Sequence, residues 1–489
     1  MRSSLLTTRR AALGGGLALA AGDLLLGGKR LAGADSPVVD AAVTALPAML
    51  QLGGGQVELL TYDGSFPGPV LRAKAGDLLR LELTNALDEP TNLHFHGLHV
   101  SPEGTADNPF VTVPPGGRFL YELPIPTGYG GTFWYHPHTH HRLARQLWRG
   151  LAGPLLVERP EDRVLAECDE QVVLIKDLTV VDGQPAPHTT ADWARGKSGR
   201  LVLVNGALQP TLTARRALVW LRLINACNGR TLLLARGDGR PLTVAALDGH
   251  LLETPQTVPE VLLTAAQRVE LLLPLAAGER VPIVSRPYNR GARREPSQVE
   301  TLLTVAAPPG LPDARMPARL AAVERLDPAA VARRRSFKMA MAFMHADSST
   351  AQEHVATQVR LGDLECWEIV NVDTQDHVFH LHTWPFQVWR RDGVEEDSPA
   401  WRDTINLRPA ERVELLIPFR DVAGRSLFHC HIAEHGDAGM MAIVEVSPDA
   451  RPSDRTRPRP DRADLAPAWP PEAAPGSICG PGAAGVERG

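Results

Sequence analysis

Residues 78–85 of the chain read LLRLELTN, an alternation of apolar and polar side chains that is typical of a half-buried β-strand. Comparable segments recur as LVWLRLIN at residues 218–225 and as ECWEIVN at residues 365–371. Each segment ends in asparagine, and the three asparagines stand 140 and 146 residues apart. A repeat of this period predicts three copies of one kind of β-sandwich domain.

The rest of the 489-residue chain is divided around these strands. We predict β-sandwich domains at residues 40–160, 165–308 and 336–448, so the expected fold class is all-β. Residues 309–335 are rich in Pro, Ala and Arg and are predicted to be a linker. Residues 449–489 are dense in Pro, Arg, Asp and Gly, a composition that predicts a C-terminal tail that either wraps the surface or stays loose.

The overall composition favours short strands and turns over long helices. Glycine and proline number 43 and 42 of 489 residues, above their usual combined share of ~12%. Only residues 141–148 and 327–335 are predicted to form short helices. The formal net charge of −5 gives no indication of nucleic-acid binding, and five cysteines are too few for a small disulfide-stapled scaffold.

The first 34 residues resemble an export signal rather than part of the fold. A basic region with Arg9 and Arg10 precedes an apolar stretch at 11–28 and an AGA cleavage-type sequence at 32–34. The arginine pair predicts a twin-arginine signal, with a chance pair in an ordinary secretory signal as the alternative. We therefore expect the mature chain to be periplasmic or extracellular and to contain no transmembrane segment.

Ten of the 17 histidines fall in four short clusters, and each cluster contains an H-x-H pair. Alternate residues of a strand point to the same face, so each pair presents two imidazoles together. Two pairs lie in the first predicted domain and two in the last. We therefore predict a metal cluster between these domains, bound by His94, His96, His136, His138, His380, His382, His429 and His431.

A second ligand set surrounds Cys430. His377, Cys430, His435 and Met440 supply two imidazoles, a thiolate and a weak axial thioether, which describes a blue-copper electron-transfer site. Strand alternation sends the Cys430 sulfur to the face opposite its two neighbouring histidines. One tripeptide is therefore predicted to join the two sites. Zinc, which favours closed tetrahedral N/S sites, fits these ligands less well than copper.

These motifs, above all residues 429–441, resemble those of the three-domain multicopper oxidases, the group of laccases and bilirubin oxidases. The resemblance implies cupredoxin-like Greek-key sandwiches and four copper ions: one type 1, one type 2 and two type 3. It implies His94 and His380 as type 2 ligands. It implies two type 3 sets and one type 1 set, namely His96, His136 and His431; His138, His382 and His429; and His377, Cys430 and His435 with axial Met440. Val378 and Thr383 stand where the family usually has Pro and Gly, which leaves the ligands unchanged and affects only the loop shape.

The resemblance also implies a reaction. Single electrons from a small reductant reach the type 1 copper at an exposed edge of His435, pass through Cys430, and reduce O₂ to water at the other three ions. The implied reductants are phenols, aromatic amines or Cu(I). Asp107 and Glu434 align with acidic residues of the family that supply protons, and their alternative interpretation is as solvated surface carboxylates.

Two other functions compete with a laccase-like oxidase. One is a cuprous oxidase for copper tolerance, although the chain has only eight methionines and no Met-rich insert. The other is a copper-free exported scaffold, against which the complete ligand set argues.

The four cysteines other than Cys430 leave the disulfide pairing open, since four cysteines allow three full pairings. We hypothesise a bond between Cys479 in the tail and Cys168, against the alternative that all four are free or buried thiols.

Overall fold

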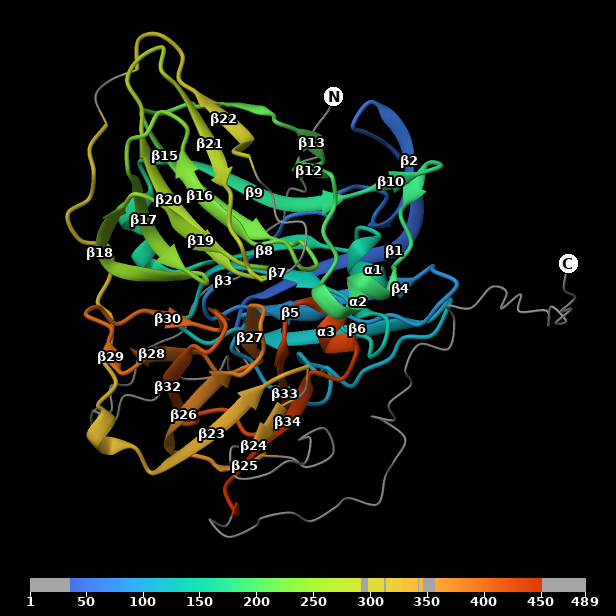
Figure 1. The fold of residues 1–489 in the computed structure, drawn as a ribbon, viewed down its shortest axis with the longest axis vertical. Helices are drawn as coiled ribbons and strands as arrows, with labels where there is room; N and C mark the ends of the chain where they lie inside the picture. Colours follow the sequence, from blue (N-terminus) through green and yellow to red (C-terminus); the bar gives the residue numbers. More distant parts are fainter. Residues whose placement is uncertain (1–35, 292–297, 312–313, 342, 346–356, 451–489) are drawn as a thin grey trace, which may run out of the picture.

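The computed structural model describes residues 36–450 except 292–297, 312–313, 342 and 346–356. The predicted export signal, nearly all of the predicted tail and the proposed Cys479 bond lie outside the described residues. The described chain is mostly β-strand and forms three sandwiches of two sheets each, which confirms the all-β prediction (Figure 1). Among the described residues, no helix is both long enough and apolar enough to cross a membrane.

The first sandwich has two four-stranded sheets, ordered β2-β1-β4-β6 and β3-β8-β7-β5. Its strands are β1 (Val38–Leu52), β2 (Gly55–Tyr62), β3 (Leu71–Lys74), β4 (Leu78–Asn85), β5 (His94–His96), β6 (Arg118–Pro124), β7 (Gly131–His136) and β8 (Gly153–Glu158). Burial alternates along β4, as its LLRLELTN sequence predicts.

The middle sandwich has sheets ordered β13-β12-β9-β15-β20-β17-β18 and β14-β22-β21-β16-β19, with a small β10–β11 hairpin beside them. Its strands are β9 (Asp169–Leu178), β10 (Val180–Val181), β11 (Gln184–Pro185), β12 (Leu201–Val204), β13 (Ala207–Leu208), β14 (Thr211–Thr213), β15 (Leu218–Asn225), β16 (Leu232–Arg236), β17 (Leu242–Leu247), β18 (His250–Val258), β19 (Val261–Leu263), β20 (Arg268–Pro274), β21 (Arg280–Arg286) and β22 (Glu300–Ala306).

The last sandwich has sheets ordered β24-β23-β26-β32-β28-β29, with β30 beside β28, and β25-β34-β33-β27-β31. Its strands are β23 (Arg333–Met339), β24 (Phe343–His345), β25 (Thr357–Arg360), β26 (Leu364–Asn371), β27 (His377–Leu381), β28 (Phe386–Arg391), β29 (Val394–Glu395), β30 (Trp401–Arg402), β31 (Thr404–Leu407), β32 (Arg412–Pro418), β33 (Gly424–Cys430) and β34 (Met441–Ser447). The predicted helix at 327–335 is wrong, because only a 3-10 turn, η2 (Pro328–Ala330), precedes β23, which pairs in parallel with β26.

The sequence repeat marks the same strand in each sandwich. β4, β15 and β26 each run parallel to the first strand of their sandwich and antiparallel to the strand on the other side. The closing asparagine has the same bonds each time. The side-chain amides of Asn85, Asn225 and Asn371 donate to two backbone carbonyls, while their side-chain oxygens accept the N–H of the residue two positions on. This bonding explains why the repeat ends in asparagine.

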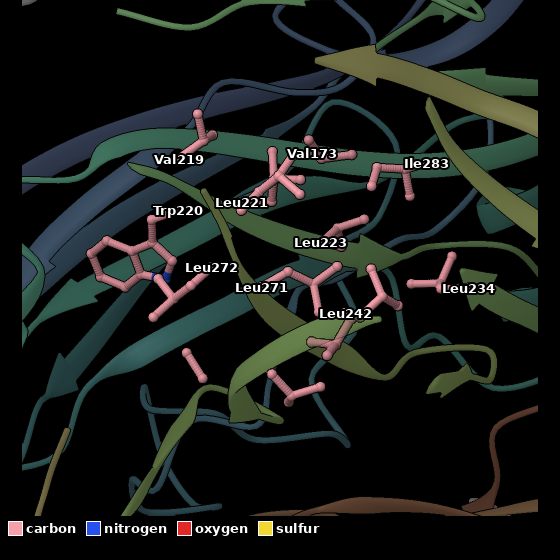
Figure 2. Close-up of a cluster of buried hydrophobic side chains, with 14 of the residues drawn as sticks. Val173, Val219, Trp220, Leu221, Leu223, Leu234, Leu242, Leu271, Leu272 and Ile283 are labelled. Carbon is pink, nitrogen blue, oxygen red and sulfur yellow. The ribbon is translucent and has the colours of Figure 1, made fainter. Parts of the chain in front are cut away.

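Each sandwich buries its own apolar core. Figure 2 shows the middle one, where Leu221 and Leu223 of β15 lie among Leu271 of β20, Ile283 of β21 and Leu234 of β16. All of β15 is buried, so its second face also packs against neighbouring structure rather than water. The middle domain is therefore joined to the rest of the molecule along a buried surface.

Three short helices meet where the sandwiches join (Figure 1). They are α1 (Leu143–Trp148), which confirms the helix predicted at 141–148, α2 (Thr190–Arg195) and α3 (Ala433–Asp437). A 3-10 helix, η1 (Pro160–Leu165), connects the first two sandwiches. The helices α1, α2 and α3 come from the first, middle and last parts of the chain, so this junction involves all three sandwiches.

Candidate metal centres

The four histidine clusters lie on equivalent strands of the first and last sandwiches. His94 and His96 are on β5, and His136 ends the neighbouring β7. The equivalent strands of the last sandwich are β27 and β33, which carry the third and fourth clusters. Their middle counterparts, β16 and β21, have no histidine. The repeat thus builds one half-site at each end of the chain.

The eight predicted cluster imidazoles come together between the first and last sandwiches, and all are buried. Rings from the two sandwiches stack, with centroids 3.9 Å apart for His94 and His382 and also for His96 and His380. The Nε2 atom of His429 lies 3.2 Å from that of His138 and 2.9 Å from that of His382. Because Nδ1 of His429 donates to the Cys430 carbonyl, its Nε2 carries a lone pair, which at these distances needs an N–H donor or a cation between the rings.

Several ring nitrogens have their lone pairs directed into this space. The Nδ1 atoms of His136, His380 and His429 lie 2.8–3.0 Å from backbone carbonyls, to which they donate. Their Nε2 atoms therefore carry lone pairs. Within the described part of the chain, Nε2 of His136 and His380 is buried without a hydrogen-bond partner, as is Nε2 of His94. Buried polar atoms normally have partners, so these orphaned acceptors fit a bound cation.

The protonation state of these rings also suits metal binding. Burial first, and neighbouring imidazoles second, lower the pKa of His94, His138 and His382 well below the usual value. Burial lowers the pKa of His136 to about 3. Neutral imidazoles are the form that binds metals.

Three of the four predicted ligands of the second site, His377, Cys430 and His435, come together. The Sγ atom of Cys430 lies 3.7 Å from Nδ1 of His377 and 3.7 Å from Nδ1 of His435. Met440 is buried in the same core, and its carbonyl accepts the Cys430 N–H at 2.9 Å. Burial raises the pKa of the Cys430 thiol to about 12, so an ion bound there has to displace a proton.

Cys430 lies between the two centres. Its sulfur faces His377 and His435, whereas the rings of His429 and His431 lie among the cluster imidazoles. The strand alternation expected for this tripeptide is therefore present, and one covalent segment connects both centres.

The two predicted acids are buried, not solvated. Asp107 lies 3.0 Å from Nδ1 of His94 and accepts the Phe95 N–H, and burial raises the pKa of Asp107 to about 8. Glu434 accepts hydrogen bonds from Asn228, from the Lys197 N–H and from His188 Nε2, at 2.8, 3.0 and 2.9 Å.

The expectation of an exposed His435 edge is wrong, because this side chain is 0% exposed. The helix α2 packs against α3, and its C-terminal residues are bonded to Gln375 of the last sandwich and to Arg290, which follows β21 of the middle one. The Ala194 carbonyl accepts the Gln375 side-chain amide at 3.0 Å, and the Arg195 carbonyl accepts a hydrogen bond from Arg290. A segment of the middle domain therefore covers the Cys430 site.

Two carboxylates that contact the ligand rings were missed from the sequence. Asp373 lies 3.0 Å from His377 Nε2. Its place shortly after the closing asparagine of the third repeat, and four residues before His377, was the one weak indication in the sequence that it contacts this ring. Asp403 lies 3.0 Å from His96 Nε2, and no local sequence pattern indicated this contact.

Thr383 stands where the family usually has glycine, and its backbone has the conformation expected of glycine. Its φ is +68°, a left-handed conformation that is rare for a β-branched residue.

Comparisons with known proteins agree with this geometry. Two family models, both described as multicopper oxidase, match residues 47–162 and 324–450. The solved multicopper oxidase of Pseudomonas thermotolerans is 30% identical, with a TM-score of 0.70, over 84% of this chain and 100% of that one. That of Campylobacter jejuni, described as a metallo-oxidase, is 26% identical, with a TM-score of 0.77, over 86% and 93%.

Curated relatives include two kinds of protein. The multicopper oxidase mco of Staphylococcus haemolyticus is 29% identical over 79% of this chain and 84% of the relative. The cell division protein FtsP of Sodalis glossinidius is 30% identical over 79% and 85%. The chain belongs to the multicopper oxidase family, whose domains are cupredoxin-like. It is accordingly a copper-dependent oxidoreductase that uses O₂ and a reducing substrate.

Proposed function

We propose that the chain is a laccase-like oxidase with four copper ions. His377, Cys430 and His435, with axial Met440, would hold the type 1 ion. His94 and His380 would hold the type 2 ion, and the two type 3 ions would be held by His96, His136 and His431 and by His138, His382 and His429. The observation that carries the proposal is the convergence of buried imidazole nitrogens, which have no hydrogen-bond partner among the described residues, beside a thiol that faces two further imidazoles.

Bound copper would supply one-electron redox steps at Cys430 and a site for the four-electron reduction of O₂ to two waters. The residues of the chain supply the connection and the environment. Cys430 joins the two centres through its backbone bonds to His429 and His431, so electrons have a short covalent path. Complete burial of the ligands keeps bulk water away from the reacting centre.

Reduction of O₂ to two waters consumes four protons, and we assign proton supply to Asp107 and Glu434. Asp107 lies directly behind His94 and, because burial raises its pKa to about 8, can hold a proton near neutral pH. Glu434 reaches toward the surface through His188, whose side chain is 10% exposed. The Asp107 contact supports proton delivery at His94, and the His188 contact gives Glu434 a route toward the surface.

The reducing substrates we propose are phenols and aromatic amines, with Cu(I) as the alternative. Because α2 covers His435, a bulky donor cannot touch this ring while α2 stays in place. The donor must therefore either transfer its electron through α2 or displace α2 from His435. The rates with a phenol, an aromatic amine and Cu(I), measured with and without added Cu(II), distinguish a laccase-like enzyme from a cuprous oxidase.

We also propose export through the twin-arginine signal in residues 1–34, on the sequence pattern alone. Replacing Arg9 and Arg10 by lysine should retain the protein in the cytoplasm. Fractionation of cells that express both forms measures this, and unchanged export would show that the arginine pair is not the signal.

Copper analysis of the purified protein, combined with O₂ uptake, tests the proposed function. Four coppers per chain and consumption of one O₂ for every four electrons from a phenol are expected. A protein that binds less than one copper, or that does not take up O₂ with any of the three donors, would contradict the proposal and favour a scaffold without copper.

A further inference from the structure

Asp403 contacts histidines from two different sandwiches. It lies between β30 and β31 of the last sandwich. Its Oδ1 atom is 3.0 Å from Nε2 of His96 in the first sandwich, and its carbonyl accepts from Nδ1 of His380 at 2.9 Å. The Thr404 hydroxyl also donates to Oδ1 at 2.7 Å. One residue therefore fixes rings that belong to both halves of the histidine cluster.

The contact with Asp403 also sets which nitrogen of His96 can bind metal. A carboxylate accepts hydrogen bonds, so the Nε2 atom of His96 has to carry the proton. The lone pair is then on Nδ1, which is buried and without a hydrogen-bond partner among the described residues. Asp403 thus holds His96 in the tautomer that directs a free lone pair into the cluster.

Asp403 is itself held by an arginine of the middle sandwich. Arg268 begins β20 and is completely buried. Its Nη1 and Nη2 atoms donate to the two carboxylate oxygens of Asp403 at 2.8 and 2.6 Å, a bidentate pair. Its remaining donors reach the carbonyls of Thr132 and Asp248 at 3.1 and 2.9 Å. The guanidinium therefore bonds to all three sandwiches.

Charge and shape both depend on this arginine. Burial alone would raise the pKa of Asp403, but the charge and hydrogen bonds of Arg268 outweigh it and hold that pKa well below its usual range. Gly97, directly after His96, has φ +87°, and a Cβ there would overlap the guanidinium of Arg268 and the carboxylate of Asp403. The glycine of the first histidine motif therefore leaves room for the ion pair.

We propose that Arg268 is a positioning residue of the histidine cluster, which acts through Asp403 on His96 and His380. The middle sandwich has no cluster histidine of its own, yet through this side chain it completes the site that the outer sandwiches share. The cluster would then hold its copper fully only when all three domains are docked. The inference rests on the proposed ligand assignment.

The positioning role of Arg268 is tested in the copper-loaded enzyme with two substitutions, Arg268→Met and Asp403→Asn. The matched control is Arg335→Met. Arg335 forms a buried bidentate pair with Glu365 in the last sandwich, at 2.6 and 2.8 Å, away from the cluster ligands. The readouts are copper per chain against increasing chelator, the type 2 copper EPR signal and the blue absorption of the Cys430 site.

We expect Arg268→Met and Asp403→Asn to lose histidine-bound copper and the type 2 signal at a chelator concentration about 10–100-fold lower than the wild type does. The blue absorption should be unchanged in both. Arg268→Lys, which keeps the charge without the bidentate contact, should fall between them and the wild type. Equal copper retention in Arg268→Met and wild type, or an equal loss in Arg335→Met, would overturn the proposal.

Should Arg268→Met not fold, Arg268→Lys and Asp403→Asn decide together: loss of cluster copper in both supports the proposal, and full retention in either overturns it. A wild type without a type 2 signal would refute the ligand assignment, and the inference with it. That result is distinct from failure of the inference alone, in which the wild type has the signal and the variants keep it.

Discussion

The two metal centres are built in opposite ways. The four proposed type 1 ligands all come from the last sandwich, on β27, β33 and the segment before β34, and a segment of the middle domain covers them. The histidine cluster takes four rings from each outer sandwich and is held from the middle one by Arg268. One centre is therefore complete within a single domain and shielded by another, whereas the other exists only between domains. A substitution at one centre should therefore change the copper content and spectrum of that centre and leave those of the other centre unchanged.

The largest effect is expected from Cys430→Ser. This change removes the thiolate whose charge transfer to copper gives the blue colour, so colour and oxidase activity should both be lost. Most histidine-bound copper should remain, because the cluster ligands are untouched. Absorption and copper analysis measure this, with Cys366→Ser, a buried thiol elsewhere in the last sandwich, as the control that stays blue. A blue Cys430→Ser protein would refute the type 1 assignment.

Asp107→Asn should slow reoxidation of the reduced enzyme by O₂ by about 10²–10⁴-fold, the usual contribution of a general acid. The amide keeps the contact with the Phe95 N–H but cannot supply a proton. Electron uptake at the type 1 centre should be unaffected. Stopped-flow reoxidation measures the effect, with Asp77→Asn, a buried acid on the β3–β4 turn, as the control. An unchanged reoxidation rate would remove Asp107 from the mechanism.

Asp373→Asn should weaken copper binding at the type 1 centre by about 10–100-fold, since the carboxylate holds the ring of His377 through Nε2. The blue absorption should disappear at lower chelator than in the wild type, while the type 2 EPR signal persists. This is the converse of the pattern expected for Arg268→Met. Loss of both signals together would mean that the two centres are not independent.

The smallest effect is expected from Thr189→Ala, at the N-cap of α2. Its hydroxyl accepts the Asp192 N–H at 3.2 Å, and loss of such a cap costs about 1 kcal/mol of helix stability. Fraying of α2 by this amount should raise kcat/KM for a bulky phenol roughly 5-fold and leave a small inorganic donor unchanged. Thr190→Ala, at the exposed first residue of α2, is the control. No change for the phenol would show that α2 does not limit access.

The features that could be predicted from the sequence are those that depend on the spacing of residues within one short segment. The LLRLELTN-type repeat indicated three sandwiches because each copy carries its own alternation and its own closing asparagine. The H-x-H pairs indicated a shared cluster because strand parity is local. Contacts made across domains were not predictable: the cover of α2 over His435, the bonds of His188 to Glu434, and the ion pair of Arg268 with Asp403. Nothing in the residues around Asp403 or Arg268 shows that their side chains meet, 135 positions apart.

We propose that this chain binds copper in two distinct centres joined by Cys430. The most direct measurement is a combined copper count, absorption spectrum and EPR spectrum of the purified wild-type protein. We expect four coppers per chain, a blue absorption that reductant bleaches and O₂ restores, and separate type 1 and type 2 EPR signals. A colourless protein with zinc at these sites, or a blue protein with a single copper, would show that the chain does not have two joined copper centres.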